Sequence, residues 1–356
     1  MSIAERARPE ILALRPYAAA VQVEDTIRLN ANEAPWTSGA DAHRRPLNRY
    51  PEIRPARLRA ALADRFDVPA HRLLVTRGSS EAIDMLIRAF CRAGVDSIAT
   101  VSPGFSMYRH YAAIQGAAVN TIAGSPDENF MPDLDGLLDA CEDDTRLVFL
   151  CSPNNPTGTS LPEPFIRSVL EARRGRSAVV VDEAYIEFSG QRSSVSMLDE
   201  FDNLVVLRTL SKALAFAGAR CGAVIGRRPV IDMLDAIQAP YAMSTPVVER
   251  VEDALSARWL GEAATRVDEI VAERERVSEA LAGLSFVGRV WPSDANFLLV
   301  RLTDVETVMN VTRGAGILLR YFGDDLADCV RISIGTRDEN DALLAALREL
   351  DQKGAD

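Results

Sequence analysis

The chain has 356 residues, a length that predicts two domains or one large domain with an appendage. Hydrophobic residues make up 47% and charged residues 26%, as in ordinary globular proteins. Its formal net charge of −11 at pH 7 disfavours a nucleic-acid-binding surface, which needs a basic face. The 40 basic residues include only two lysines, Lys212 and Lys353, and neither has the glycine-rich setting of a phosphate-binding Walker loop. Because Lys353 lies at the C-terminus, chemistry that needs a side-chain amine depends on Lys212.

The cysteines and histidines indicate neither a disulfide framework nor a metal site. The five cysteines are odd in number and widely spaced, which predicts reduced thiols in a cytoplasmic protein. The three histidines, His43, His71 and His110, have no metal-ligand spacing, so we expect no bound metal. The N-terminal residues lack the apolar core of a signal peptide, and no apolar run is long enough to span a bilayer.

From residue 73 onward, short β-branched segments alternate with longer amphipathic ones. This pattern predicts an α/β fold whose large domain has a mostly parallel sheet covered by helices. Glu81–Phe90 has its apolar residues on one helical face, and Ser160 with Glu163 indicates a capping box for a helix that ends near Arg174. The expected strands are Leu73–Thr76, Ser97–Val101, Leu147–Cys151, Ala178–Val181, Leu204–Leu207 and Cys221–Gly226.

After Pro246 the pattern changes to a long charged and amphipathic stretch, which predicts one long helix or two abutting helices. Two expected strands, Asn296–Leu302 and Cys329–Ile334, and a helix near Asn340–Leu350 follow. We therefore expect a large domain over residues 45–245 and a smaller α+β domain formed from both termini, residues 1–44 and 246–356.

In a doubly wound sheet, ligands bind at the carboxyl ends of the strands, so the residues after each strand are candidate site residues. Arg77–Ser80 follows the first strand and is either a phosphate-binding turn or an ordinary capped turn into a helix. Ser152–Gly158 contains two prolines and two asparagines, and is either a plain rigid turn or a stiff holder for amide side chains.

Two further strand ends carry an acid and the internal lysine. Asp182 ends an apolar strand and either caps a turn or holds a cationic group of a ligand. Lys212 is either a surface lysine or a nucleophilic amine with a lowered pKa. Arginine fills nearly every other basic position, which favours an amine function, because arginine does not form an imine. Together with Arg220, these groups fit pyridoxal 5′-phosphate, which needs an amine, a carboxylate and phosphate donors.

Three segments resemble the fold-type I pyridoxal-phosphate aminotransferases: SPNNPTG at 152–158, DEAY at 182–185, and TLSK at 209–212 with the arginine that follows at 220. NANE at 30–33, NRYP at 48–51 and APY at 239–241 resemble, more narrowly, the histidinol-phosphate aminotransferases. The resemblance extends over essentially the whole chain. It implies a transaminase of histidine biosynthesis that acts on histidinol phosphate and 2-oxoglutarate in a ping-pong reaction, as a homodimer with shared active sites.

The resemblance also implies roles for individual residues. Lys212 forms the internal aldimine and then moves the proton between the α-carbon and the cofactor, while Asp182 keeps the pyridine nitrogen protonated. Asn155 and Tyr185 hydrogen-bond the phenolic oxygen, and Phe105 takes the ring-stacking position. The phosphate contacts implied are Ser79, Ser80, Thr209, Ser211, Arg220 and, from the neighbouring subunit, Tyr50; the substrate contacts implied are Tyr17, Asn32, Arg320 and Arg331.

The sequence leaves more than one candidate substrate. Phe105 stands where the family often has a tyrosine, and the segment from Arg320 to Arg331 is short and acidic. An arginine fork binds a carboxylate as well as a phosphate ester, so an aromatic amino-acid aminotransferase is the alternative. A phospho-amino-acid decarboxylase of the same fold and a non-enzymatic pyridoxal-phosphate-binding regulator are further alternatives, although no basic DNA-binding domain precedes the first strand.

Overall fold

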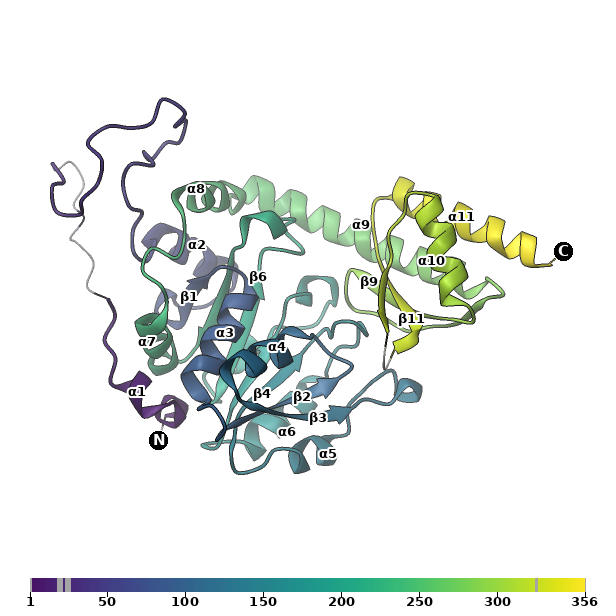
Figure 1. Ribbon diagram of the computed structural model, residues 1–356, viewed down its shortest axis with the longest axis horizontal. Coiled ribbons are helices and arrows are strands. Elements are labelled where there is room, and N and C mark those ends of the chain that lie inside the picture. Colours follow the sequence, from purple (N-terminus) through teal and green to yellow (C-terminus); the bar gives the residue numbers. More distant parts are fainter. Residues whose placement is uncertain (1, 18–21, 23–26, 324–325, 356) are drawn as a thin grey trace.

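The computed structural model describes residues 2–17, 22, 27–323 and 326–355, and it contains two β-sheets of different size (Figure 1). The larger sheet has seven strands in the order β1-β7-β6-β5-β4-β2-β3. β7 is antiparallel to both of its neighbours, and the other pairs are parallel, which confirms the predicted mostly parallel sheet. The strands are β1 (Leu73–Thr76), β2 (Ser97–Ser102), β3 (Ala118–Ala123), β4 (Thr145–Cys151), β5 (Ala178–Asp182), β6 (Leu204–Thr209) and β7 (Gly222–Gly226).

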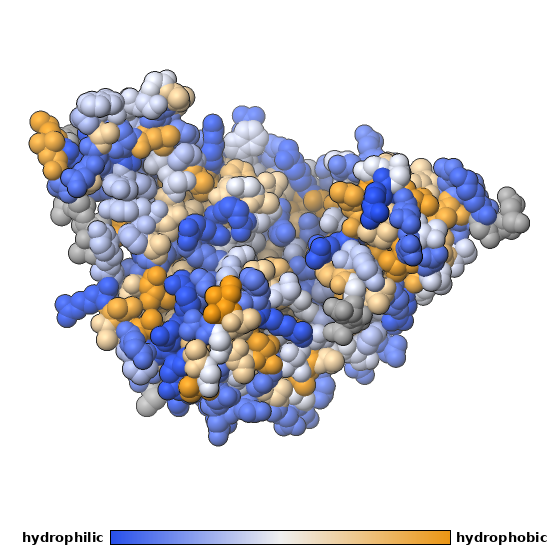
Figure 2. Space-filling model, in the orientation of Figure 1, coloured by the Kyte–Doolittle hydropathy of each residue, from blue (hydrophilic) through white to orange (hydrophobic). Residues whose placement is uncertain are grey.

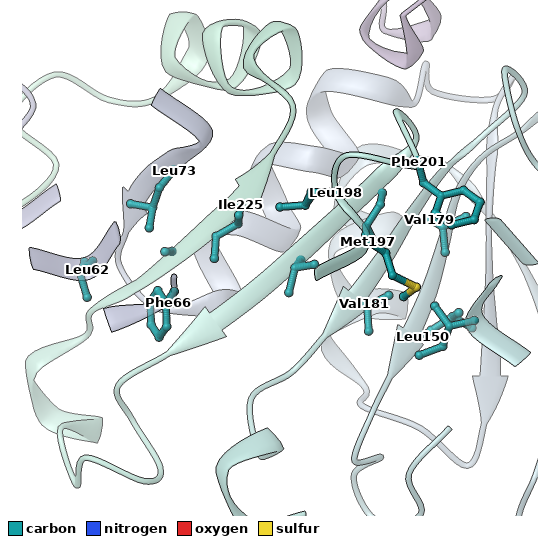
Figure 3. Packing of buried hydrophobic residues seen from close by; sticks show 14 of the residues in the cluster. Leu62, Phe66, Leu73, Leu150, Val179, Val181, Met197, Leu198, Phe201 and Ile225 are labelled. Carbon is teal, nitrogen blue, oxygen red and sulfur yellow. The ribbon is translucent and has the colours of Figure 1, made fainter. Parts of the chain in front are cut away.

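Helices cover both faces of this sheet. In β5, Val179 and Val181 belong to one hydrophobic core, whereas Ala178 and Val180 belong to the core on the opposite face. Figure 3 shows the first core, in which Val179 and Val181 pack in one cluster with Phe201. Burial on both faces explains why these strands are apolar at every position. One layer contains α3 (Ser79–Phe90), α4 (Met107–Gln115) and α7 (Arg228–Ile237); the other contains α2 (Ala56–Arg65), α5 (Leu134–Asp139), α6 (Glu163–Ala172) and α8 (Thr245–Ala254).

The smaller sheet has four antiparallel strands in the order β10-β11-β9-β8 and packs against three helices. The stretch after Pro246 forms two helices, α8 and α9, separated at Leu255 and Ser256. In the part of the chain that the structure describes, no helix is both long and apolar enough to cross a membrane. The elements are β8 (Val287–Val290), β9 (Phe297–Leu302), β10 (Arg320–Gly323), β11 (Leu326–Ser333), α9 (Ala257–Ala282), α10 (Val305–Gly314) and α11 (Arg337–Ala355).

The first helical turns correct one part of the predicted domain division. η1 (Ile3–Arg6) and α1 (Pro9–Leu12) lie against the layer of α3 and α7, and not against the smaller sheet. Ile3 is fully buried there, and the Arg8 N–H donates to the Ala89 carbonyl at 2.9 Å. The apolar residues of these turns are buried against the larger core. The predicted grouping of residues 1–44 with residues 246–356 is therefore wrong for these turns. The remaining boundaries stay a prediction.

The helix predicted to begin at Ser160 begins later. α6 starts at Glu163 after Pro162, and no side chain caps its first turn. A proline disfavours helical backbone at the residue before it, so Leu161 stays outside the helix and Ser160 is too distant to cap it. The buried Ser160 hydroxyl has no hydrogen-bond partner among the described residues.

Residues 13–50, the N-terminal arm, contain no helix or strand where the structure describes them, and they extend away from the sheets (Figure 1). Arg45 Nη2 of the arm binds Glu252 of α8 at 2.9 Å. Ile27 and Leu29 are each 90% exposed, and hydrophobic side chains on the arm are visible at the upper left of Figure 2. The arm is therefore attached near its base and leaves large apolar groups in solvent.

Candidate active site

The carboxyl ends of β1, β2, β4, β5 and β6 meet at one edge of the larger sheet. Because β7 is antiparallel, its amino end lies at the same edge. A cavity of about 690 Å³ opens there and extends to β10 and β11 of the smaller sheet. Its walls are formed by Ser79, Ser80, Gly104, Phe105, Ser106, Cys151, Asn155, Asp182, Ala184, Tyr185, Thr209, Ser211, Lys212, Ala217, Arg220, Arg320, Phe322 and Arg331.

The corner of the cavity between β1 and β7 is built around two glycines. Gly78, at φ +77°, turns the chain into α3, whose first turn has no side-chain cap. A Cβ atom at Gly78 would lie 2.7 Å from Arg220 Nη2, and one at Gly222 would lie 3.0 Å from the Cα of Gly78. Only glycine fits at both positions, and the guanidinium therefore lies against the positive end of a helix, an arrangement that favours an anion.

Hydroxyl groups line the same corner. Arg220 Nη1 donates to Ser211 Oγ at 3.3 Å, and Thr209 Oγ1 lies 2.9 Å from Ser211 Oγ. Arg220 adopts a left-handed backbone conformation at φ +54°, which costs free energy for a residue with a side chain and is concentrated at functional sites. The predicted phosphate contacts from this chain, Ser79, Ser80, Thr209, Ser211 and Arg220, thus share one corner of the cavity.

Lys212 lies in the loop that follows β6, and its Nζ is 5.4 Å from the ring centroid of Tyr185. Burial lowers the pKa of Lys212, and the nearby cations Arg331 and Arg220 lower it further, against the opposing effect of Asp182. No described residue accepts a hydrogen bond from Lys212 or pairs with it as an ion. The lysine that the sequence singled out is therefore an amine in the cavity wall whose pKa lies below its ordinary value.

Asp182 ends β5 and is 2% exposed. Its Oδ2 accepts a hydrogen bond from the Tyr108 hydroxyl at 2.9 Å, and its Oδ1 accepts one from the Ala184 N–H at 3.2 Å. Burial raises the pKa of Asp182 to about 6, although both hydrogen bonds oppose the rise. The adjacent Glu183 is also buried but pairs with Arg208 at 3.6 Å, so Asp182 is the acid that reaches the cavity.

A chain of side chains joins the two sheets across the cavity. Arg331 Nη1 donates to Asn155 Oδ1 at 2.5 Å, and Asn155 Nδ2 donates to the Tyr185 hydroxyl oxygen at 3.3 Å. The guanidinium of Arg331 also lies 5.1 Å from the ring of Phe297 and 5.5 Å from that of Phe322. Its buried Nε has no partner among the described residues, so one donor stays available for an anion.

Three predicted site residues do not reach this cavity. Tyr17 is 59% exposed and Tyr50 is 50% exposed, both on the N-terminal arm, where Asn32 is also exposed. Tyr50 stacks on Tyr241 with ring centroids 4.6 Å apart. Within one chain, the structure brings together the residues predicted at strand ends and on β10 and β11, but not those on the arm.

Three groups at the cavity or beneath it were missed in the sequence. Tyr108 follows Phe105 by three residues on the same loop and helix, a spacing that brings side chains together on a helix. Cys151 ends β4 directly before the SPNNPTG segment, where a strand-end argument would have included it. Phe322 lies two residues after Arg320 on β10, and the alternation of a strand puts both on the same face.

The whole chain is similar to known aminotransferases. The family model described as aminotransferase class I and II matches residues 23–347. A histidinol-phosphate aminotransferase of Xylella fastidiosa is 42% identical over 98% of this chain and 97% of its own length. A histidinol-phosphate aminotransferase of Stenotrophomonas maltophilia is also 42% identical, over 96% of this chain and 95% of its own.

A solved structure gives the same result. The histidinol-phosphate aminotransferase of Sinorhizobium meliloti, in complex with pyridoxal 5′-phosphate, matches with a TM-score of 0.76 and 26% identity. The match covers 86% of this chain and 84% of that chain. These similarities confirm the resemblance seen in the sequence motifs, and the chain belongs to the aminotransferase class I and II family.

Proposed function

We propose that this aminotransferase moves an amino group between histidinol phosphate and 2-oxoglutarate, with pyridoxal 5′-phosphate as cofactor. The observation that carries the proposal is the composition of one cavity: an anion corner, an amine of lowered pKa near a buried acid, and an arginine pair on the smaller sheet. Relatives named histidinol-phosphate aminotransferase, 42% identical over nearly the whole chain, support this substrate over an aromatic amino acid.

The residues around the cavity fit the cofactor. The corner of the cavity between the first turn of α3 and Arg220 would hold the phosphate, with the hydroxyls of Thr209 and Ser211 as further donors. Asp182 would hold the protonated pyridine nitrogen, and Phe105 would cover the ring. When bound, the cofactor supplies an electron sink for the bond broken at the substrate α-carbon.

Lys212 would attach the cofactor and move the proton. Its lowered pKa keeps more of the amine unprotonated near neutral pH, which a nucleophile and a general base both require. Tyr185 and Asn155, linked by their 3.3 Å hydrogen bond, would bind the phenolic oxygen of the cofactor. The chain therefore provides separate groups for attachment, charge stabilisation and proton transfer.

Arg331 and Arg320 would bind the anionic group of each substrate. They are paired in register on β11 and β10 at the rim of the cavity, and Arg331 retains a buried donor without a partner in the described part of the chain. A planar guanidinium donates equally well to the carboxylate of glutamate and to the phosphate ester of histidinol phosphate. This explains how one site serves two amino donors that differ at this end.

A second copy of the chain would complete the site. Tyr50 is half exposed outside its own cavity, and Ile27 and Leu29 of the same arm stand 90% exposed. Solvent exposure of several large apolar side chains on one segment is typical of a protein–protein contact. We therefore place Tyr50 at the phosphate corner of the partner subunit, with Tyr17 and Asn32 as contacts to substrate, in a symmetric homodimer.

The test is a scan of single half-reactions. Purified protein loaded with pyridoxal 5′-phosphate is mixed separately with histidinol phosphate, phenylalanine, tyrosine and glutamate, and the loss of visible absorbance is followed. We expect histidinol phosphate and glutamate to react fastest. Faster reaction with phenylalanine or tyrosine than with histidinol phosphate would favour the aromatic aminotransferase instead.

The second lysine gives this experiment an internal control. Lys353 is exposed, pairs with Glu349 at 2.7 Å and does not line the cavity, so it should not attach the cofactor. Borohydride reduction followed by peptide mapping should find the cofactor on Lys212 alone, and Lys212→Ala should abolish both the label and the half-reactions. A label on Lys353, or no label, would refute the proposed site.

A further inference from the structure

Tyr108 lies in the first turn of α4, and its side chain is only 1% exposed. Its ring stacks on Phe149 of β4 with centroids 4.6 Å apart and planes 15° apart. It also meets Phe105 edge to face, with centroids 5.6 Å apart. Because Phe149 belongs to the buried sheet and Phe105 lines the cavity, the tyrosine ring links the rigid core to the cavity wall.

The hydroxyl group of Tyr108 reaches the acid of the site. It donates to Asp182 Oδ2 at 2.9 Å, while the Ala184 N–H holds Oδ1 at 3.2 Å. Each carboxylate oxygen therefore has one donor from this chain, which fixes the plane of the carboxylate. Burial raises the pKa of Tyr108 well above its ordinary value, so the hydroxyl keeps its proton and stays a donor at every pH of interest.

Four other ionisable groups face Asp182, and none replaces this donor. Burial raises the pKa of Cys151 and of Tyr185, so both stay neutral. Glu183 raises the pKa of Asp182 by repulsion, and Lys212 lowers it through its charge without a hydrogen bond. Among the causes that favour the ionised carboxylate, the tyrosine hydrogen bond is the largest.

We propose that Tyr108 is a positioning residue, whose hydroxyl holds Asp182 ionised and oriented while its ring fixes Phe105, so that one side chain sets two contacts to the cofactor ring. This inference rests on the proposed function, since it needs a cofactor nitrogen for Asp182 to meet. Tyr108 touches neither cofactor nor substrate in this scheme and acts only through its two neighbours.

The variant Tyr108→Phe tests the inference, because it keeps the stacked ring and removes the hydroxyl. Loss of a donor to the ionised form raises the pKa of Asp182, so tight cofactor binding should require a higher pH. Cofactor affinity, measured by fluorescence titration, falls on the acid side of its pH profile, which we call the acid limb. We expect the midpoint of this acid limb to move to a pH higher by about one unit or more. Tyr111→Phe, a tyrosine of the same helix outside the cavity, is the matched control and should leave the limb in place.

Two further measurements separate the possible failures. In an Asp182→Asn background, Tyr108→Phe should cause no additional movement of the limb. An unchanged limb in Tyr108→Phe, even with a lowered melting temperature, would reduce the residue to a packing role and overturn the proposal. If the wild-type chain bound no pyridoxal 5′-phosphate, the proposed function would fail. The pH dependence of unfolding without cofactor would still show whether Tyr108 favours the ionised Asp182.

Discussion

Asp182 carries a cost that its function explains. Without cofactor, burial raises its pKa from the ordinary value of 3.8 to about 6, which corresponds to about 3 kcal/mol of destabilisation once the group is ionised. Since the folded-state pKa is the higher one, this loss begins above pH 3.8, grows up to about pH 6, and is complete at higher pH. A bound cation would offset this destabilisation, so the buried Asp182 carboxylate favours binding of a positively charged ligand.

We therefore expect Asp182→Asn to stabilise the cofactor-free protein at pH 8 by up to about 3 kcal/mol, because the amide has no charge to bury. The gain should shrink as the pH falls below 6, and cofactor affinity and turnover should both decrease. Urea unfolding at several pH values measures the first effect. Asp127→Asn, whose side chain is 95% exposed, should change stability by less than about 0.5 kcal/mol. Equal stability of wild type and Asp182→Asn at pH 8 would contradict this account.

Strand-end reasoning found the residues whose chemistry depends on their position in the chain. Asp182, Asn155 and Lys212 were predicted because each lies at the end of an apolar strand or in the loop that follows it, and all three line the cavity. Tyr108 was missed because its role comes from a hydrogen bond to a residue 74 positions away, and no local pattern reports such a contact. The sequence thus predicts the residues that line the cavity better than it predicts the residues that hold those side chains in place.

At the scale of elements, the direction of β7 determines the position of Arg220. Because β7 is antiparallel to β1 and β6, Arg220, two residues before β7 begins, lies at the edge where β1 and β6 end. The close approach of Gly222 to Gly78, and of Gly78 to Arg220, then fixes the distance between β7 and the first turn of α3. The anion corner is therefore a property of how two elements pack.

This packing predicts opposite outcomes for the two glycines at the ends of β7. A Cβ at Gly222 would lie 2.6 Å from the Arg208 carbonyl oxygen, so Gly222→Ala must push the strand and should cost about 1–3 kcal/mol. Cofactor affinity should fall with it, because Arg220 is displaced. At Gly226 the nearest atom is 3.7 Å away, and Gly226→Ala should be nearly neutral. Equal effects in urea unfolding and in cofactor titration would show that the corner is not packed as described.

Elements with mixed polarity were the hardest to predict. β3 lies at the edge of the larger sheet and is partly exposed along its length, so its residues lack the apolar continuity of the buried strands. β8 and β10, at the two edges of the smaller sheet, were missed for the same reason. A strand that is buried on both faces has a continuous apolar sequence, which is easy to recognise. Edge strands are less buried, so their sequences lack this pattern.

For the whole molecule, the N-terminal arm is the part that a single chain leaves unexplained. Its internal structure is well bonded: Glu33 accepts hydrogen bonds from Arg28 at 2.5 Å, from Arg49 at 2.9 Å and from the Tyr50 N–H at 2.8 Å. These bonds hold the backbone of Tyr50 in place while its side chain remains half exposed. A preformed segment that presents apolar groups to solvent is consistent with the proposed contact with a second copy.

Mixing two impaired variants distinguishes a shared site from a self-contained one. In a heterodimer of Lys212→Ala and Tyr50→Phe subunits, the Tyr50→Phe subunit keeps its lysine and would receive an intact Tyr50 from its partner. Random pairing should then restore about a quarter of the wild-type sites, whereas each variant alone, taken through the same dissociation and reassociation, should stay impaired. If Tyr50 acts within its own subunit, no heterodimer has a complete site and activity does not recover. A monomer in sedimentation at assay concentration would reject the shared site directly.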